Sequence, residues 1–188
     1  SQIIDTLYKY RKQLTKEDNL LIYYAGHGVL DDEIGKGYFQ PVDAKEDSVS
    51  SWISNSDMLD PLRAIKAKHI MLVADSCFSG SLTQTRGANF SNEGSEDSDW
   101  IDKKRQLPSR TVLSSGNLEP VNDGGKDGHS IFGYWFLKAL NEINEPTTAR
   151  QIFTKIEGRI SLNSDQEPQY KELKKMGSEG GDFIFVKR

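Results

Sequence analysis

The chain is 188 residues long, carries a net charge of −4 and contains one cysteine. This length suits a single domain with its own core, and an acidic balance without a basic block argues against binding to nucleic-acid phosphates. One cysteine excludes an internal disulfide and favours a reducing, cytoplasmic compartment, while no apolar run approaches the roughly 20 residues that span a membrane.

The first elements in chain order are a helix and a buried strand. Apolar side chains in residues 2–14 recur at helical spacing, which predicts an amphipathic helix. The run Leu20–Gly28 is apolar and ends in Ala-Gly-His-Gly. An apolar run without alternation is typical of a strand buried on both faces, so we predict that His27 lies at the end of such a strand.

A loop, a short strand and a helix follow this strand. Leu30–Lys36 is acidic and punctuated by glycine, which predicts a solvated turn, and residues 37–44 predict a short strand or hairpin that ends at Pro41. Asn-Ser-Asp at 55–57 predicts the cap of a helix that runs to about Lys68. This helix would be the crossover that makes the next strand parallel to the first.

The next strand, His69–Ala74, leads into Asp75, Ser76 and Cys77. Parallel neighbouring strands end at the same edge of a sheet, so we expect His27 and Cys77 to lie close together. A lone cysteine is most often a small buried side chain, but an adjacent imidazole can take the thiol proton and create a nucleophile.

The rest of the chain predicts one long loop and four regular elements. Residues 81–110 hold few apolar side chains, and a loop of this length is usually functional or disordered. The predicted elements are a strand at 111–116, a helix capped by Ser130, a helix capped by Thr147 or Thr148, and a final strand at 180–186. Neither His69 nor His129 ends a strand beside glycines, so we expect both to be structural or solvated.

Two motifs together resemble a known family. Tyr-Ala-Gly-His-Gly, followed about fifty residues later by Asp-Ser-Cys-Phe-Ser-Gly, is similar to the caspase-like cysteine peptidases, and most of all to metacaspases and orthocaspase-like bacterial caspase homologues. The resemblance implies an α/β three-layer sandwich with a mostly parallel central sheet, an antiparallel edge strand and helices on both faces. It also implies that the closing strand at 180–186 is that antiparallel edge.

The resemblance implies one peptidase domain over residues 1–188. Residues 1–80 would be the part that is like a large subunit, without its first strand, and residues 111–188 the part that is like a small subunit. A long unpaired edge is rarely tolerated, so we expect a preceding segment or a partner chain to complete the sheet. The flexible linker 81–110 would be either the processing site of a zymogen or a loop that is never cut. Its basic residues are Arg86, Lys103, Lys104, Arg105 and Arg110.

The resemblance also implies a catalytic dyad of His27 and Cys77. His27 takes the proton from Cys77, the thiolate attacks the scissile carbonyl, and the backbone N–H groups of Gly28 and Cys77 stabilise the oxyanion. Asp75 stands two residues before Cys77, on the same side of the strand, where a carboxylate favours a cationic side chain. We therefore predict cleavage after Arg or Lys. Further substrate contacts are implied at Ala25, Ser114, Ser115 and Glu119.

Calcium is a ligand of some metacaspases. Asp43 matches one of their ligands, but Asn55 and Ser56 stand where those enzymes have a pair of carboxylates. One carboxylate is too few for a hard cation, so we expect no metal site and no cofactor.

The main alternative is a catalytically silent caspase-fold scaffold or regulatory subunit. The presence of both His27 and Cys77 favours the enzyme. A nucleotide-binding domain is disfavoured because no glycine-rich phosphate loop follows a strand, and a serine hydrolase because no Gly-x-Ser-x-Gly surrounds Ser76 or Ser79. Bacterial caspase homologues also occur beside sensor domains in immune and cell-death systems, which makes bacterial immunity one setting that the resemblance implies.

Overall fold

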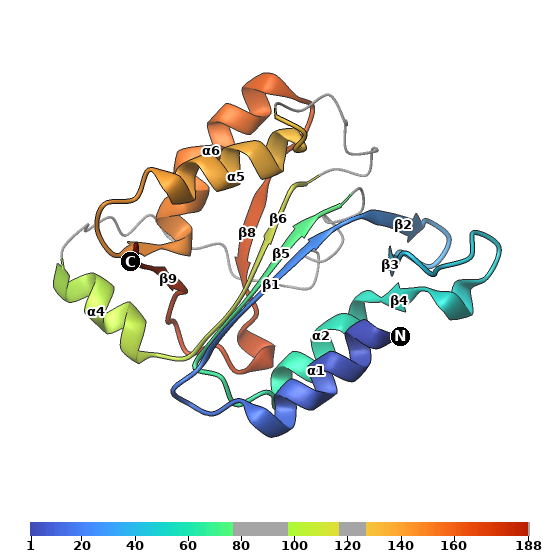
Figure 1. Ribbon diagram of the computed structural model, residues 1–188, viewed down its shortest axis with the longest axis horizontal. Coiled ribbons are helices and arrows are strands. Elements are labelled where there is room, and N and C mark those ends of the chain that lie inside the picture. The colour runs from blue at the N-terminus through green and yellow to red at the C-terminus, as the bar shows by residue number, and fades with distance from the viewer. Residues whose placement is uncertain (77–97, 117–126, 188) are drawn as a thin grey trace.

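A four-stranded sheet forms the middle layer of the computed structural model, which describes residues 1–76, 98–116 and 127–187 (Figure 1). Its strands are β1 (Asn19–Ala25), β5 (His69–Asp75), β6 (Ser109–Ser114) and β8 (Gln169–Glu172), in the order β1-β5-β6-β8. The first three run parallel, and β8 pairs antiparallel with β6. The predicted parallel pairing of the histidine strand with the strand that leads to Cys77 is therefore confirmed.

Helices cover both faces of this sheet (Figure 1). On one face lie α1 (Gln2–Gln13) and α2 (Asn55–Ala64), and on the other lie α5 (Ile131–Asn141) and α6 (Ala149–Asn163). The mostly parallel sheet, its antiparallel edge strand and the two helix layers confirm the predicted three-layer α/β fold class. No described helix combines the length and the apolar character that crossing a bilayer requires.

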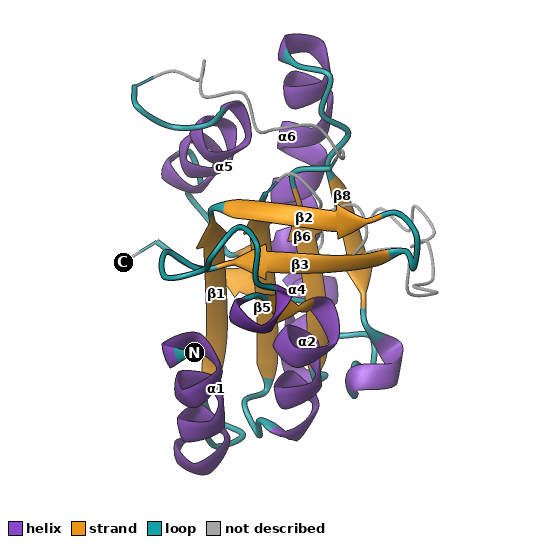
Figure 2. Ribbon diagram, turned by 90° about the vertical axis from the view of Figure 1, so that its right-hand side faces the viewer, coloured by secondary structure: helices purple, strands orange, loops and turns teal. Residues whose placement is uncertain are grey.

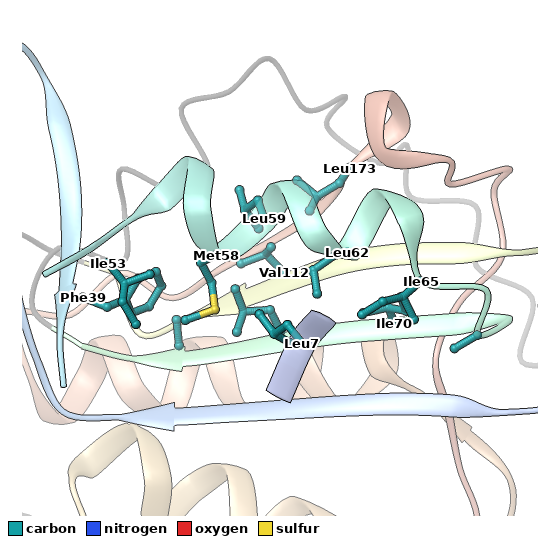
Figure 3. Close-up of a cluster of buried hydrophobic side chains, with 13 residues drawn as sticks. Leu7, Phe39, Ile53, Met58, Leu59, Leu62, Ile65, Ile70, Val112 and Leu173 are labelled. Atoms are coloured by element: carbon teal, nitrogen blue, oxygen red, sulfur yellow. The ribbon is translucent and has the colours of Figure 1, made fainter. Parts of the chain in front are cut away.

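Strand β5 is buried along its whole length because both of its faces are covered. Ile70 and Leu72 face the hydrophobic cluster beneath α1 and α2, which Figure 3 shows, whereas Met71 and Val73 face the cluster beneath α5 and α6. Each fully buried aliphatic side chain of this size contributes about 1.5–3 kcal/mol. The uninterrupted apolar run in the sequence thus reflects a strand that is shared by two cores.

The helix starts are fixed by short polar side chains. Ser130 Oγ accepts a hydrogen bond from the N–H of Gly133, and Thr148 forms a reciprocal capping box with Gln151. These contacts confirm the predicted caps of α5 and α6. Helix α2 begins one residue earlier than predicted, after the cap Ser54, and it ends at Ala64 rather than near Lys68.

A second, antiparallel sheet crosses the carboxyl end of the main sheet (Figure 2). It contains β2 (His27–Asp31), β3 (Lys36–Gln40) and β4 (Ile53–Ser54), and the short helix η1 (Val49–Ser51) precedes β4. The prediction of one strand through Gly28 was therefore wrong in detail, because the chain turns at Gly26 and His27 begins a new strand. The predicted loop at 30–36 shrinks to a tight turn, in which Gly35 has a φ of +63°.

The second half of the predicted linker has regular structure. Residues Ser98–Gln106 form helix α4, which buries Ile101, and β6 begins at Ser109. Arg110 is buried within β6, where its guanidinium donates to the carbonyl oxygens of Ile65 and Lys68. The prediction of a flexible segment is thus wrong from Ser98 onward. The candidate cleavage site Arg86 lies outside the described residues.

The end of the chain does not add the edge strand that was predicted at 180–186. Strand β9 (Ile184–Phe185) pairs instead with β7 (Thr147–Thr148), in a separate two-stranded sheet. The short helix η2 (Lys174–Met176) follows β8, which forms the antiparallel edge of the main sheet. Asp182 anchors this closing segment, because it accepts hydrogen bonds from the Tyr170 hydroxyl and from the backbone N–H of Arg150.

Candidate active site

The carboxyl ends of β1 and β5 meet, as the sequence predicted. Ala25 stands opposite Asp75, and the N–H of Gly26 donates to the carbonyl oxygen of Asp75 over 3.4 Å. His27 follows β1 after one intervening residue, Gly26, and Ser76 comes directly after Asp75, the last residue of β5. Cys77 lies outside the described residues, and so does Glu119. The described structure thus brings His27 and Asp75 to the same edge of the sheet.

His27 is exposed, and its backbone is held from the preceding strand. The hydroxyl of Tyr24 lies 2.7 Å from the carbonyl oxygen of His27 and 2.9 Å from that of Gln40. The Tyr24 ring packs edge-on against the buried Phe39, with ring centroids 4.7 Å apart. A rigid aromatic side chain therefore fixes the corner from which His27 projects.

A pocket of about 740 Å³ opens beside His27. Its walls are the end of β1, the start of α1 and the loop that follows β3, and Asp43 and Glu46 are its acidic lining residues. The histidine is therefore open on one side. Gly28, the predicted oxyanion donor, lies in β2 opposite Phe39, and Ala25 is exposed at the end of β1.

Asp75 is almost completely buried, with 5% of its surface exposed. Two hydroxyl groups donate to its Oδ2 atom, namely Tyr23 over 3.1 Å and Ser130 over 2.5 Å. The other oxygen, Oδ1, has no hydrogen-bond partner among the residues that the structure describes. Ser76 Oγ and Ser114 Oγ at the same edge of the sheet also lack a partner there. Buried polar atoms are nearly always satisfied, so Oδ1 is a candidate acceptor for a donor outside the described residues.

The electrostatics of Asp75 result from two opposing effects. Burial raises the pKa of its carboxyl group, because a charge is less stable away from water. The hydrogen bonds from Ser130 and then Tyr23 oppose this shift by stabilising the ionised form. The same environment raises the pKa of Tyr23, first through burial and then through the nearby Asp75 charge. Tyr23 therefore remains a donor to the carboxylate.

Ser114 and Ser115 lie at the carboxyl end of β6, next to this site, and both are fully buried. Ser115 Oγ donates to the carbonyl oxygen of Ser76 and accepts from its N–H, both over 3.3 Å. Ser114 stands opposite Ala74 in the sheet. Ser115 therefore holds the backbone at Ser76, whereas Ser114 Oγ has no hydrogen-bond partner among the described residues. Contact of either serine with substrate remains a prediction.

A family model described as Caspase domain, Peptidase_C14, matches residues 1–177. The chain belongs to the caspase family. This membership supports a caspase-like cysteine peptidase. Among solved structures, the crystal structure of protein GSU0716 from Geobacter sulfurreducens is similar with a TM-score of 0.60 and 16% identity, over 99% of this chain and 78% of that chain. That likeness shows the shared fold alone. A search of curated proteins finds no match.

The candidate site of this caspase-family chain includes two residues that the sequence did not single out for function. Tyr23 and Ser130 both contact Asp75, but Tyr23 was one apolar residue of a strand and Ser130 only a helix cap. Strand alternation offered a partial signal, because Tyr23 lies two positions before Ala25, which stands opposite Asp75. The contact with Ser130 depends on where α5 packs, which no local pattern encodes.

The other two histidines lie where the sequence predicted structural or solvated roles. His69 begins β5, at the amino end of the strand, and its two ring nitrogens lie within 2.9 Å of Ser109 Oγ and the carbonyl oxygen of Arg105. His129 is exposed in the turn before α5.

The described part of the chain contains no group of three or more His, Cys, Asp or Glu side chains that could share an ion. Asp43 is exposed in a turn, whereas Asn55 and Ser56 form the first turn of α2.

Proposed function

We propose that this caspase-family chain is a cysteine endopeptidase that uses His27 and Cys77 to cleave peptide bonds after Arg or Lys. The observation that carries the specificity is the buried Oδ1 of Asp75, which lacks a hydrogen-bond donor among the described residues. A guanidinium or ammonium group of a substrate supplies such a donor together with the opposite charge.

In the proposed mechanism, His27 accepts the proton of the Cys77 thiol, and the resulting thiolate attacks the scissile carbonyl carbon. Negative charge moves to the carbonyl oxygen, where the N–H groups of Gly28 and Cys77 stabilise it. Such a contact is worth roughly 3–4 kcal/mol in other enzymes. The C–N bond then breaks as His27 returns its proton to the leaving amine. Water finally hydrolyses the thioester and restores the thiol.

The pairing of β1 supports a proposal about partners. No described strand pairs with its outer edge, and its side chains Leu21 and Tyr23 are 41% and 42% exposed. An unpaired strand edge is a template for another strand. We infer that an additional strand, from a preceding segment of the polypeptide or from a partner chain, pairs there. We propose two routes to activation, namely cleavage of the linker or pairing of this additional strand with β1.

The decisive experiment measures hydrolysis of four fluorogenic peptides that differ only in the residue before the cleaved bond: Arg, Lys, Asp or citrulline, the uncharged isostere of Arg. The variants are Cys77→Ala and His27→Ala, with His129→Ala as the control because His129 is also an exposed histidine. Each is assayed with and without calcium. We expect turnover after Arg and Lys that both dyad variants abolish and that the control retains.

Other outcomes decide between the alternatives. Turnover only after Asp would retain the dyad and overturn the role of Asp75. No turnover with any of the four peptides, by a folded protein, would favour a scaffold or regulatory subunit.

A further inference from the structure

The carboxylate of Asp75 is held by side chains from two different layers of the fold. Tyr23 comes from β1 within the sheet, and Ser130 comes from the start of α5 on the face above it (Figure 1). Both hydroxyl groups donate to the same oxygen, Oδ2. Asp75 is therefore fixed through one oxygen, while Oδ1 has no donor among the described residues.

We propose that Tyr23 and Ser130 are specificity-determining positioning residues: their hydroxyl groups hold Oδ2 of Asp75 so that Oδ1 receives the cationic side chain of a substrate. This inference rests on the proposed cleavage after Arg or Lys. It assigns a role to two residues that do not themselves contact the reacting atoms.

The direction of the Ser130 hydrogen bond is set by helix α5. Ser130 Oγ already accepts from the N–H of Gly133 over 2.8 Å, and its single hydrogen is then donated to Asp75. The start of a helix carries partial positive charge, so this arrangement transmits the helix dipole to the carboxylate. The cap of α5 thus also stabilises the ionised form of Asp75.

The Tyr23 ring contacts the helix whose start carries Ser130. It packs against Phe136 of α5, with ring centroids 6.0 Å apart. Phe136 is buried, so the contact and the hydrogen bond to Asp75 hold the half-exposed Tyr23 side chain from two sides. Removal of the hydroxyl alone would therefore leave the ring in place and delete only the donor.

Gly133 provides the room for this arrangement. A methyl group on its Cα would lie 3.0 Å from Ser130 Oγ, 3.2 Å from Tyr23 Oη and 3.3 Å from Asp75 Oδ2. The three polar atoms thus converge on a space that only glycine leaves open. We expect Gly133→Ala to disturb all three atoms by a few tenths of an ångström.

The two protonation states of Asp75 have different consequences for Oδ1. When the carboxyl is ionised, Oδ1 is a buried acceptor that attracts a cation. When it is protonated on Oδ1, the site presents a neutral donor, and the preference for Arg over an uncharged isostere disappears. Burial favours the protonated state, and the two hydroxyl groups oppose it. Losing both donors would therefore weaken charge recognition.

The test compares peptides ending in Arg and in citrulline. The variants are Tyr23→Phe, Ser130→Gly and the double variant, since glycine is a tolerable helix cap that lacks the hydroxyl. Tyr8→Phe, at an exposed position on α1, is the matched control. We expect kcat/KM for the Arg peptide to fall about 10-fold in each single variant, because a hydrogen bond to a charged group is lost. The citrulline peptide should be unaffected, and Ser130→Thr should restore the preference.

If Tyr23 and Ser130 had a merely structural role, the double variant would lower kcat/KM for both peptides by the same factor. An unchanged ratio of kcat/KM for the Arg peptide to kcat/KM for the citrulline peptide would therefore overturn the inference. Asp75→Asn gives the reference value for a complete loss of the preference for Arg over citrulline, because it retains the shape of the side chain and removes its charge.

A binding measurement separates this inference from the proposed function. Titration of Cys77→Ala protein with the same two peptides reports the cation site without catalysis. If the wild-type protein lacks turnover but Cys77→Ala binds the Arg peptide selectively, and Tyr23→Phe abolishes that selectivity, then only the proposed reaction fails. If turnover after Arg depends on Asp75 but not on Tyr23 or Ser130, then only this inference fails. If the wild-type protein lacks turnover and Cys77→Ala binds the Arg and citrulline peptides equally, then both the proposed function and this inference fail.

The pH dependence of binding is a further readout. Tyr23 of β1 contacts Asp75, α5 has no acidic residue in its first turn, and His27 lies at the same sheet edge. In Cys77→Ala protein the double variant should shift the acid limit of Arg-peptide binding to higher pH, because burial of Asp75 is then no longer opposed by the two hydroxyl groups. An equal shift in the binding of the citrulline peptide would show that the effect does not come from the charge of Asp75.

Discussion

The hydroxyl of Tyr24 lies 2.7 Å from the backbone carbonyl oxygen of His27. Tyr24 belongs to the main sheet, whereas His27 begins the small sheet that crosses its carboxyl end. This contact therefore positions the candidate general base relative to the strand that precedes it.

Tyr24→Phe should reduce activity more than stability. The change leaves the ring packed on Phe39 but removes the donor to His27, so we expect a loss of about 1 kcal/mol in the free energy of unfolding. A small displacement of a catalytic group can cost up to about 100-fold in rate, and we expect kcat to fall about 10-fold with KM little changed. Peptide hydrolysis and urea denaturation measure both effects. Equal kcat in Tyr24→Phe and in the control Tyr8→Phe would contradict this role.

Gly116, two residues after the end of β6, has a backbone conformation that strongly favours glycine. Its φ is +78°, and an added Cβ would lie 1.9 Å from the carbonyl oxygen of Glu167. Gly116→Ala must therefore separate two backbone segments, and we expect a loss of about 3 kcal/mol or more.

The control is Gly158→Ala within α6, where nothing lies within 4 Å of the added methyl group. Alanine at that position should stabilise the protein by about 1 kcal/mol, because glycine is a poor helix former. Denaturation midpoints that move in the same direction in both variants would refute this prediction.

Asp182 should make the protein less stable as the pH rises from about 4 to about 6. Burial raises the pKa of its carboxyl group to about 6, against a usual value of 3.8. Between these values the native state keeps a proton that the unfolded chain has released, so the free energy of unfolding falls with increasing pH, by up to about 3 kcal/mol. Burial of Asp75 acts in the same direction.

Urea denaturation of wild-type protein and Asp182→Asn at pH 4 and pH 7 checks this expectation. The lowered pKa of His69, which results mainly from burial, changes stability in the opposite direction. The difference between the two proteins isolates Asp182, because His69 is present in both. A pH-independent difference would show that Asp182 titrates normally.

Processing of the chain should leave the bond after Arg110 intact. Its carbonyl oxygen accepts a hydrogen bond from the N–H of Leu173 over 2.7 Å, and β6 is paired on both sides. A peptidase needs an accessible extended segment, which this strand cannot provide while the protein is folded. Mass spectrometry of the processed protein should therefore detect no fragment that begins with Thr111. Detection of such a fragment from folded protein would show that the pairing of β6 does not protect the bond after Arg110.

The sequence predicted those elements whose local pattern determines them. Strand β5 is covered on both faces, which leaves an apolar run, and Ser130 precedes an apolar helix as a short polar cap. Helix α4 was missed because it buries only Ile101 and its other residues are mostly charged or polar. Strand β2 was missed because its residues were divided between the end of the first predicted strand and the predicted loop at 30–36, whereas its pairing with β3 defines it as a separate strand.

Within the candidate site, the apolar run of β5 was enough to predict that Asp75 lies at the end of this strand, and its position relative to Cys77 stays a prediction. The partners of Asp75 were not predictable in the same way. Tyr23 reaches it because Ala25, rather than a neighbour, stands opposite Asp75, and this register depends on the packing of the whole sheet.

The turn at Gly26 divides the candidate site between two sheets. His27 belongs to the small crossing sheet, whereas Asp75 belongs to the central sheet. The Tyr24 hydroxyl, which lies close to the carbonyl oxygens of His27 and Gln40, connects the two sheets beside that turn. The surroundings of His27 therefore depend on how the two sheets meet, and a substitution in the β2–β3 hairpin can alter them without changing the pairing of the central sheet.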